Sequence, residues 1–363
     1  MAVVAMARDD RGEARRQAAP APPPVVRELT LRDVERWDRF VLDHPAATFC
    51  HRAGWARVLR RAFGYDTRFL YVEQGERITG VLPLVAVRSR LFGSYLVSSA
   101  FAVYGGPVCA DDTARRLLTN RARELADVLD VDYLEYRSRT PVEPSWAHKS
   151  DLYVTFQRPL GGDPQALLGG LSTKRRNIKK AEKLGATATL DQDLERFYDV
   201  FATSTRNLGT PVLPQRYFQA IWEEFADDVE ILTVAANDQP LSAAMLFYFR
   251  DDAHCYYVGN TPAARDAAAS DYMWWRAMAR GIERGCKSFD MGRSKRNTGS
   301  FEFKRRWGVE PTPLHYEYYL RRGTAVPDTN PLNPKYRLFI ETWKRLPLPV
   351  ANRLGPLVIK GLA

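Results

Sequence analysis

The expected secondary-structure elements occur twice along the chain in the same order, and this repeat limits the fold more than any single motif does. The first series is a hairpin of strands at 69–73 and 78–87, a strand at 95–104, a helix at 111–129 and strands at 131–137 and 152–157. The second series is a hairpin of strands at 229–236 and 241–249, a strand at 253–259, a helix from 270 or 271 to 285 and strands at 288–291 and 314–320. We therefore expect an α+β protein made of two similar domains, each with a mixed β-sheet flanked by helices.

The length of the chain, 363 residues, fits two domains of ordinary size. Residues 1–26 are rich in Ala, Pro and Arg and show no hydrophobic period, which predicts a disordered tail. We place the first domain at 27–162, the second at 163–323 and a C-terminal tail at 324–363.

The C-terminal tail contains a predicted helix near 336–344 and ends in a hydrophobic segment. We expect this tail to pack across the domains. The alternative is peripheral contact with the inner-membrane surface through a set of aromatic, cationic and aliphatic residues: Trp343, Lys344, Arg345, Leu357, Val358 and Ile359.

Cysteine usage and hydropathy indicate the compartment. The four cysteines, Cys50, Cys109, Cys255 and Cys286, form no CxxC pair, which favours a reducing environment and argues against a zinc site. No stretch approaches the roughly 18 apolar residues of a membrane helix, and the apolar run at 2–7 is too short for a signal peptide. We expect a cytoplasmic protein that binds no metal. If the C-terminal tail contacts the inner membrane, the protein would be peripheral there.

The positive charge of the chain is concentrated in two short segments. The sequence has 53 Lys and Arg against 43 Asp and Glu, a net charge of +10. Residues 174–183 carry six cations and one Glu, and residues 293–306 carry the same balance, so these two segments account for the whole excess. Concentrated charge predicts specific sites for an anionic ligand more than a general nucleic-acid surface.

The segment 289–319 combines this charge with aromatic side chains. Phe301, Phe303 and Trp307 are interleaved with the cations, which predicts a walled pocket, whereas a solvated charged loop is the alternative. Gly292 and Gly299 permit turns in the basic loop that other residues resist.

At this point the sequence resembles a known family. The motifs KRRNIKKAEKLG, RNLGTP and FDMGRSKRNTGSFEFKRRWG resemble the FemAB-related group within the GNAT acyltransferase superfamily. Two further segments, GTPVLPQRYF and NPKYRLFIETWKRLPLP, are similar to the branch associated with PEP-CTERM and exosortase systems of exopolysaccharide-producing bacteria. The resemblance extends from about residue 28 to residue 360.

The resemblance implies two tandem GNAT-like N-acyltransferase domains, the second of FemAB type. It implies transfer of an acyl or aminoacyl group to an amine, as in the Fem ligases that build peptidoglycan cross-bridges. The donor would be an acyl-CoA or an aminoacyl-tRNA, with no tightly bound cofactor. The acceptor would be an envelope or exopolysaccharide precursor, either an anionic small molecule or a lipid-linked sugar.

The resemblance also assigns residues. Lys304, in SFEFK, matches the lysine that acts at the reacting carbonyl or the donor phosphate, and Arg293 would lie at the opening of the same pocket. Both can supply positive charge where an oxyanion develops. Asp290 would hold or deprotonate the amine if burial raises its pKa, or it would be a structural carboxylate paired with Arg293 or capping the backbone.

Further candidates for substrate binding are aromatic, cationic or polar residues of the same segments and their expected neighbours. They are Tyr104, Lys174, Arg175, Arg206, Tyr257, Asn260, Ser294, Phe303 and Trp307. For Tyr257, packing in the core is an equally good explanation.

One departure from the superfamily pattern keeps alternatives open. The glycine-spaced loop that normally holds the pyrophosphate of coenzyme A is missing at 259–270 and at 105–112. A charged tRNA therefore remains an alternative donor, attracted by the two basic segments. Two other hypotheses are a non-catalytic component that binds a glycan precursor of the exopolysaccharide machinery, and RNA binding as an end in itself.

Overall fold

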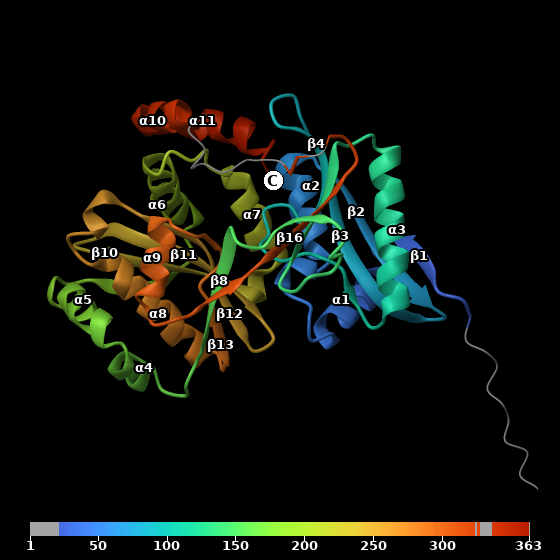
Figure 1. Cartoon of the computed structure of the whole chain (residues 1–363). Helices are drawn as coiled ribbons and strands as arrows, with labels where there is room; N and C mark the ends of the chain where they lie inside the picture. The colour runs from blue at the N-terminus through green and yellow to red at the C-terminus, as the bar shows by residue number, and fades with distance from the viewer. Residues whose placement is uncertain (1–21, 324, 327–335, 363) are drawn as a thin grey trace, which may run out of the picture.

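The computed structural model describes residues 22–323, 325–326 and 336–362 (Figure 1). Most of the predicted tail, 1–26, lies outside these described residues. Its last two residues, Val25 and Val26, belong to a β-strand, so the fold begins slightly earlier than expected.

The first of two mixed sheets has eight strands, in the order β1-β2-β3-β4-β6-β16-β7, with β5 paired to β3. The strands are β1 (Val25–Glu28), β2 (Asp66–Gln74), β3 (Arg77–Ser89), β4 (Gly93–Ser98), β5 (Val108–Cys109), β6 (Tyr133–Ser138), β7 (Ala147–Lys149) and β16 (His315–Leu320). Helix α3 (Asp112–Val128) covers one face and supplies buried residues such as Leu118 and Leu125. Helices α1 (Val34–Asp43) and α2 (Gly54–Phe63) cover the other face.

The second sheet also has eight strands, in the order β14-β8-β13-β12-β11-β10-β9, with β15 paired to β8. The strands are β8 (Tyr153–Pro159), β9 (Thr187–Asp191), β10 (Val229–Ala236), β11 (Gln239–Phe249), β12 (Asp252–Asn260), β13 (Ser288–Asp290), β14 (Ser294–Lys295) and β15 (Pro311–Pro313). Helix α8 (Ala269–Glu283) packs on one face and α6 (Leu194–Asn207) on the other. In both sheets the long helix connects a parallel pair of strands, β4 with β6 and β12 with β13.

The remaining helices surround these layers. They are α4 (Pro164–Gly170), α5 (Ser172–Lys183), α7 (Gln215–Glu224), α9 (Gly299–Arg305), α10 (Arg337–Arg345), α11 (Leu348–Ile359) and the short 3-10 turns Leu31–Asp33, Phe49–His51, Ala226–Asp228 and Pro262–Ala264. Figure 1 shows α10 and α11 together at one side of the molecule, above α6.

Two strands are exchanged between the halves of the chain. The strand expected at 152–157 forms β8, which lies in the second sheet between β14 and β13, and the strand expected at 314–320 forms β16, which lies in the first sheet. The expectation that each half completes its own sheet was wrong in this respect. Hydrophobic alternation identifies a strand, but the partner of that strand depends on contacts distant in sequence. The domain boundaries at 162 and 323 stay a prediction.

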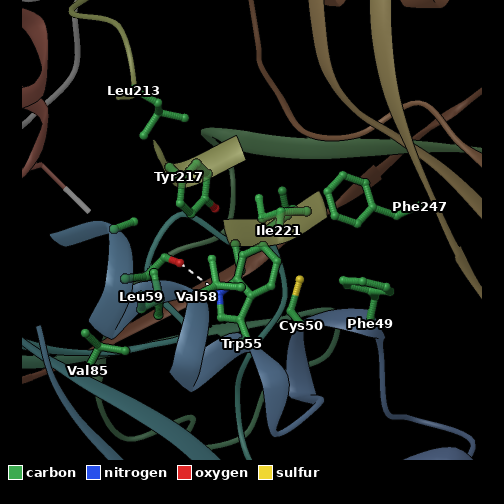
Figure 2. Close-up of a cluster of buried hydrophobic side chains, with 14 of the residues drawn as sticks. Phe49, Cys50, Trp55, Val58, Leu59, Val85, Leu213, Tyr217, Ile221 and Phe247 are labelled. Carbon is green, nitrogen blue, oxygen red and sulfur yellow. Dashed lines mark hydrogen bonds between the residues drawn. The ribbon is translucent and has the colours of Figure 1, made fainter. Parts of the chain in front are cut away.

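A single hydrophobic cluster connects the two halves. Figure 2 shows Trp55 of α2 against Tyr217 of α7, and Phe49 near Phe247 of β11. The ring centroids are 6.3 Å apart in the first pair and 4.9 Å apart in the second, both edge-on. Aromatic contacts of this kind add to the free energy gained by burial alone.

Several segments differ locally from their expected structure. Strand β4 ends at Ser98 rather than near residue 104, because Ser99 and Phe101 adopt positive φ angles of 56° and 57° in a turn. Helix α8 begins at Ala269, so Asp271 lies within its first turn. Strand β9, helix α11 and helix α9 were not predicted.

Gly259 is where helix α6 approaches the second sheet most tightly. A Cβ atom at Gly259 would lie 2.6 Å from Cα and 2.7 Å from N of Phe201, and these backbone atoms cannot swing aside. We expect Gly259→Ala to lower the free energy of unfolding by about 1–3 kcal/mol, measured by urea denaturation. Gly161→Ala is the control, since nothing lies within 4 Å of its Cβ position. Equal stability of the two variants would contradict this close packing.

Candidate active site

A cavity of about 720 Å³ opens where the 101–103 loop of the first half meets β12, β13 and α9 of the second. Phe101 and Val103 contribute one wall and Trp274 and Phe303 another. The basic loop after β13 and the helix α9 complete it. The segment 289–306 therefore folds around a pocket with aromatic walls.

Asp290, at the end of β13, is the most enclosed charge beside this cavity, with 1% of its surface exposed. Its carboxylate accepts four hydrogen bonds, from Tyr104 Oη (2.6 Å), Thr155 Oγ1 (2.8 Å), Gln157 Nε2 (3.2 Å) and the Gly292 amide (2.7 Å). Arg139 Nη2 lies 3.5 Å away. Two of the donors come from β8, so the strand exchange builds this cluster.

The pKa of Asp290 is held below its ordinary value. Burial alone would raise it, but the positive charge of Arg139, 3.5 Å away, favours the carboxylate. The hydrogen bonds from Tyr104 and Thr155 act in the same direction. The condition for a base role, a pKa raised by burial, is therefore not met. Of the two structural alternatives, pairing with Arg293 was wrong, because Arg139 takes that place, whereas the hydrogen bond from the Gly292 amide is a backbone cap.

Lys304 is buried beneath the basic loop. Helix α9, capped by Thr298, places Phe301 and Lys304 on its inner face, three residues apart. The Lys304 Nζ atom donates hydrogen bonds to the carbonyl oxygens of Gly292 (2.8 Å) and Arg293 (3.1 Å). Burial lowers the pKa of Lys304 to about 8, although the charge of Asp290 opposes this shift.

Arg293 lines the cavity; its assigned place at the opening of the pocket stays a prediction. Its side chain is exposed, yet Nη1 donates to Tyr316 Oη at 2.8 Å and the guanidinium lies 4.7 Å from the centroid of Tyr153. Arg293 also lines a second cavity of about 320 Å³ on the first sheet, which contains the buried ion pair of Glu135 and Arg137.

Lys174 is not available to a ligand in this structure. Its Nζ atom donates to Asp271 Oδ1 at 2.8 Å and lies 4.4 Å from the ring centroid of Phe303 and 5.2 Å from that of Trp307. The buried pair holds α5 against α8. Phe303 lines the cavity, whereas Trp307 lies in the core beneath it.

The other predicted binding residues are dispersed. Tyr257 and Asn260 line the cavity, with Tyr257 bonded to Tyr217 at 2.7 Å. Arg175 is exposed on α5, and Arg206 donates to the carbonyl oxygen of Lys344 in the tail. Two of the set are buried beside the site and do not line it: Tyr104 and Ser294.

A second groove of about 900 Å³ continues from the main cavity along α5, α6 and the start of α8. The two share five lining residues: Leu208, Asn260, Arg265, Ser270 and Phe303. Its charged residues are the cations Lys180 and Arg265 and the carboxylates Asp266 and Asp271, of which Asp271 is paired with Lys174. Sequence analysis put Lys180 in a basic segment without assigning it a role, and did not identify Arg265.

His254 is a further cavity residue that the sequence did not reveal. Its Nε2 atom lies 3.8 Å from Asp290 Oδ1 and is buried without a hydrogen bond. Burial lowers the pKa of His254, so the ring is neutral at neutral pH. A lone histidine within an alternating strand gives no signal of function.

Within the described ranges, no three His, Cys, Asp or Glu residues gather in a way that could hold a metal ion. Among the same residues, no helix has the length and apolar character needed to cross a membrane.

Comparisons with known proteins agree with this architecture. Residues 171–305 match the family model of the acetyltransferase (GNAT) domain. A search of curated proteins finds no significant match. The family model covers part of the second half alone. The α+β fold of two GNAT-like halves is confirmed by the solved structures described next, while the exosortase-associated branch stays a prediction.

Solved structures with the same fold have low sequence identity to this chain. FemX is 15% identical over 87% of this chain and 100% of its own, with a TM-score of 0.64. L-PGS from Bacillus licheniformis is 14% identical over 86% and 97%, with a TM-score of 0.51. A tandem GNAT protein from the clavulanic acid biosynthesis pathway is 13% identical over 84% and 100%, with a TM-score of 0.52.

Proposed function

We propose that this protein transfers an acyl or aminoacyl group to an amine in the cavity between its two halves. The observation that carries the proposal is a buried lysine, Lys304, set beneath a basic loop inside the region that matches an acetyltransferase domain. Its neighbours supply a neutral base and an enclosed carboxylate, which is the chemistry that such a transfer requires.

In the proposed reaction the nitrogen of a neutral amine attacks the donor carbonyl. A C–N bond forms, and the bond from the carbonyl carbon to the leaving sulfur or oxygen breaks. Lys304 stabilises the oxyanion and protonates the leaving group. Its pKa of about 8 is close to that of a thiol, so proton transfer to a leaving thiolate costs little.

The amine must lose a proton during the same reaction. His254, neutral and on the cavity wall, is the proposed acceptor of that proton. Asp290 is already ionised and saturated with donors, so its proposed role is to orient His254 and the Gly292 turn.

The groove that holds Lys180 and Arg265 is the proposed place for the donor. Side-chain cations there would replace the missing glycine-spaced loop as partners of phosphate. An acyl-CoA is the first donor to test, and an aminoacyl-tRNA is the alternative. The proposed acceptor is an amine on an anionic or lipid-linked envelope or exopolysaccharide precursor.

The rate of transfer should fall at alkaline pH. Raising the pH through about 8 removes the proton from Lys304 and with it the charge that stabilises the oxyanion. An amine acceptor becomes more reactive over the same range, so kcat should show a maximum rather than a steady rise. The measurement is kcat against pH for the wild type and for the residual activity of Lys304→Ala. If kcat of the variant falls at alkaline pH as that of the wild type does, the fall is caused by titration of a group other than Lys304.

The direct test is a donor panel. Purified protein is incubated with acyl-CoAs or aminoacyl-tRNAs and amino sugars, and products are followed by mass spectrometry. Amide product, dependent on Lys304, supports the transferase. Tight binding of a precursor with no product from any donor would favour the alternative of a non-catalytic binding component, for which the saturated Asp290 is the motivating observation.

A further inference from the structure

Each of the two C-terminal helices packs one face against the rest of the protein. Trp343 of α10 and Ala351 of α11 are buried, and Gly355 lies so close to the 206–213 segment that a Cβ would be 2.7 Å from Val212 N. Figure 1 shows both helices along one side of the molecule. Their inner faces therefore have a partner within the chain.

Their outer faces carry large hydrophobic side chains. On α10, Leu338 is 79% exposed, whereas Phe339, 39% exposed, stacks on the buried Trp343 with ring centroids 5.2 Å apart and so lies towards the inner side. On α11, Val350, Leu354 and Leu357 are exposed, with Leu357 at 74%. The spacing i, i+4, i+7 places these three on one face of the helix. These five are among thirteen exposed large hydrophobic side chains in the part of the chain that the structure describes, so the two helices hold far more than their share.

Exposed cations accompany this apolar surface. They are Arg337 and Arg345 on α10 and Arg353 and Lys360 on or just after α11. Helix α11 and the residues up to 362 contain no Asp or Glu, and the one acid of α10, the exposed Glu341, is paired with Lys344. A protein interface usually loses charge towards its centre, whereas mixed cations and aliphatic residues on one helical face are typical of an anionic lipid surface.

We propose that this outer face, formed by Leu338, Val350, Leu354 and Leu357 together with the four cations named above, docks on an anionic lipid bilayer. The hydrophobic side chains would enter the boundary between headgroups and acyl chains, and the cations would meet lipid phosphates. Neither helix spans the bilayer; both would lie along it.

Helix α10, which carries part of the docking face, contacts the 206–209 segment at the opening of the cavity. Arg206 Nη1 donates to the carbonyl oxygen of Lys344 at 3.2 Å, and a Cβ at Gly209 would lie 2.5 Å from Ile340. Between them Leu208, 70% exposed, lines both the cavity and the groove. Docking would thus bring the site to a bilayer that carries a lipid-linked acceptor; this consequence, unlike docking itself, depends on the proposed function.

The test is co-sedimentation of the full chain with vesicles of phosphatidylcholine alone and with phosphatidylglycerol added. We expect binding to the anionic vesicles that weakens as salt is raised. Leu354→Glu/Leu357→Glu should weaken binding by at least about tenfold. Val128→Glu, an exposed site on α3, should bind as the wild type does. All three proteins should unfold at the same temperature, because the changed side chains lie at the surface.

Two results would overturn the proposal. One is a wild type that binds neither kind of vesicle. This includes a wild type that forms an oligomer through this face, which the double variant would then fail to form. The other is equal vesicle binding by the wild type and the double variant. None of these measurements depends on transfer activity. The proposed docking surface can therefore be contradicted while the proposed transferase function stands, and the reverse is also true.

Discussion

Lys304→Ala should reduce transfer to a small residual rate while leaving the protein folded. Removing one group that stabilises an oxyanion typically lowers kcat by about 10²–10³-fold, and loss of the leaving-group proton adds to this. The variant also leaves the carbonyl oxygens of Gly292 and Arg293 without their buried donor, so stability should decrease slightly. Activity is measured with the donor found in the panel, and folding by circular dichroism.

Arg305→Ala is the matched control for Lys304. It removes a cation from the next position of the same helix, where the side chain is exposed and pairs only with Glu302 in the same turn. We expect transfer within about twofold of the wild type, because an exposed ion pair contributes little. Full activity in Lys304→Ala, or equal losses in the two variants, would contradict the assigned role.

Asp290→Ala should have the largest effect on stability. The change leaves four donors without an acceptor, three of them from the buried Tyr104, Thr155 and Gly292, and removes the partner of Arg139. We expect the free energy of unfolding to fall by about 3 kcal/mol, measured by urea denaturation at neutral pH.

The loss in Asp290→Ala should depend on pH in a definite direction. The folded pKa of Asp290 lies below its unfolded value of about 3.9, so its stabilisation is complete above that value and disappears as the pH falls through the folded pKa. The difference between wild type and variant should therefore narrow under acid conditions. Asp151→Ala, at an exposed site just before β8, is the control and should change stability by less than about 0.5 kcal/mol. A difference that is constant with pH would mean that Asp290 is not ionised in the folded protein.

Local patterns predicted most elements of this fold. The hairpins β2–β3 and β10–β11 and the helices α3 and α8 follow from alternation, helical spacing and end signals. The sequence could not show that β8 and β16 pair with the opposite sheet, because their strand patterns fit either edge. Pairing was decided by contacts such as Gln157 opposite Asp290.

The same limit applies to the site. The basic segments and aromatics indicated a pocket, and Lys304 and Arg293 lie at it. Sequence could not show that Lys174 is taken by Asp271, 97 residues away, nor that Arg139 rather than Arg293 faces Asp290. His254 and Arg265 could not be identified as site residues from the sequence, because the residues around them come together only in the folded protein.

The exchange of β8 and β16 makes the two halves mutually dependent during biosynthesis and evolution. A nascent chain that has emerged only as far as residue 300 holds β6 but not β16, so the first sheet lacks an inner strand until nearly the whole second half is made. The first half should therefore need its partner, or a chaperone, until translation is almost complete. A recombination event near residue 162 would likewise separate each sheet from a strand it needs, so the pair is inherited as one unit.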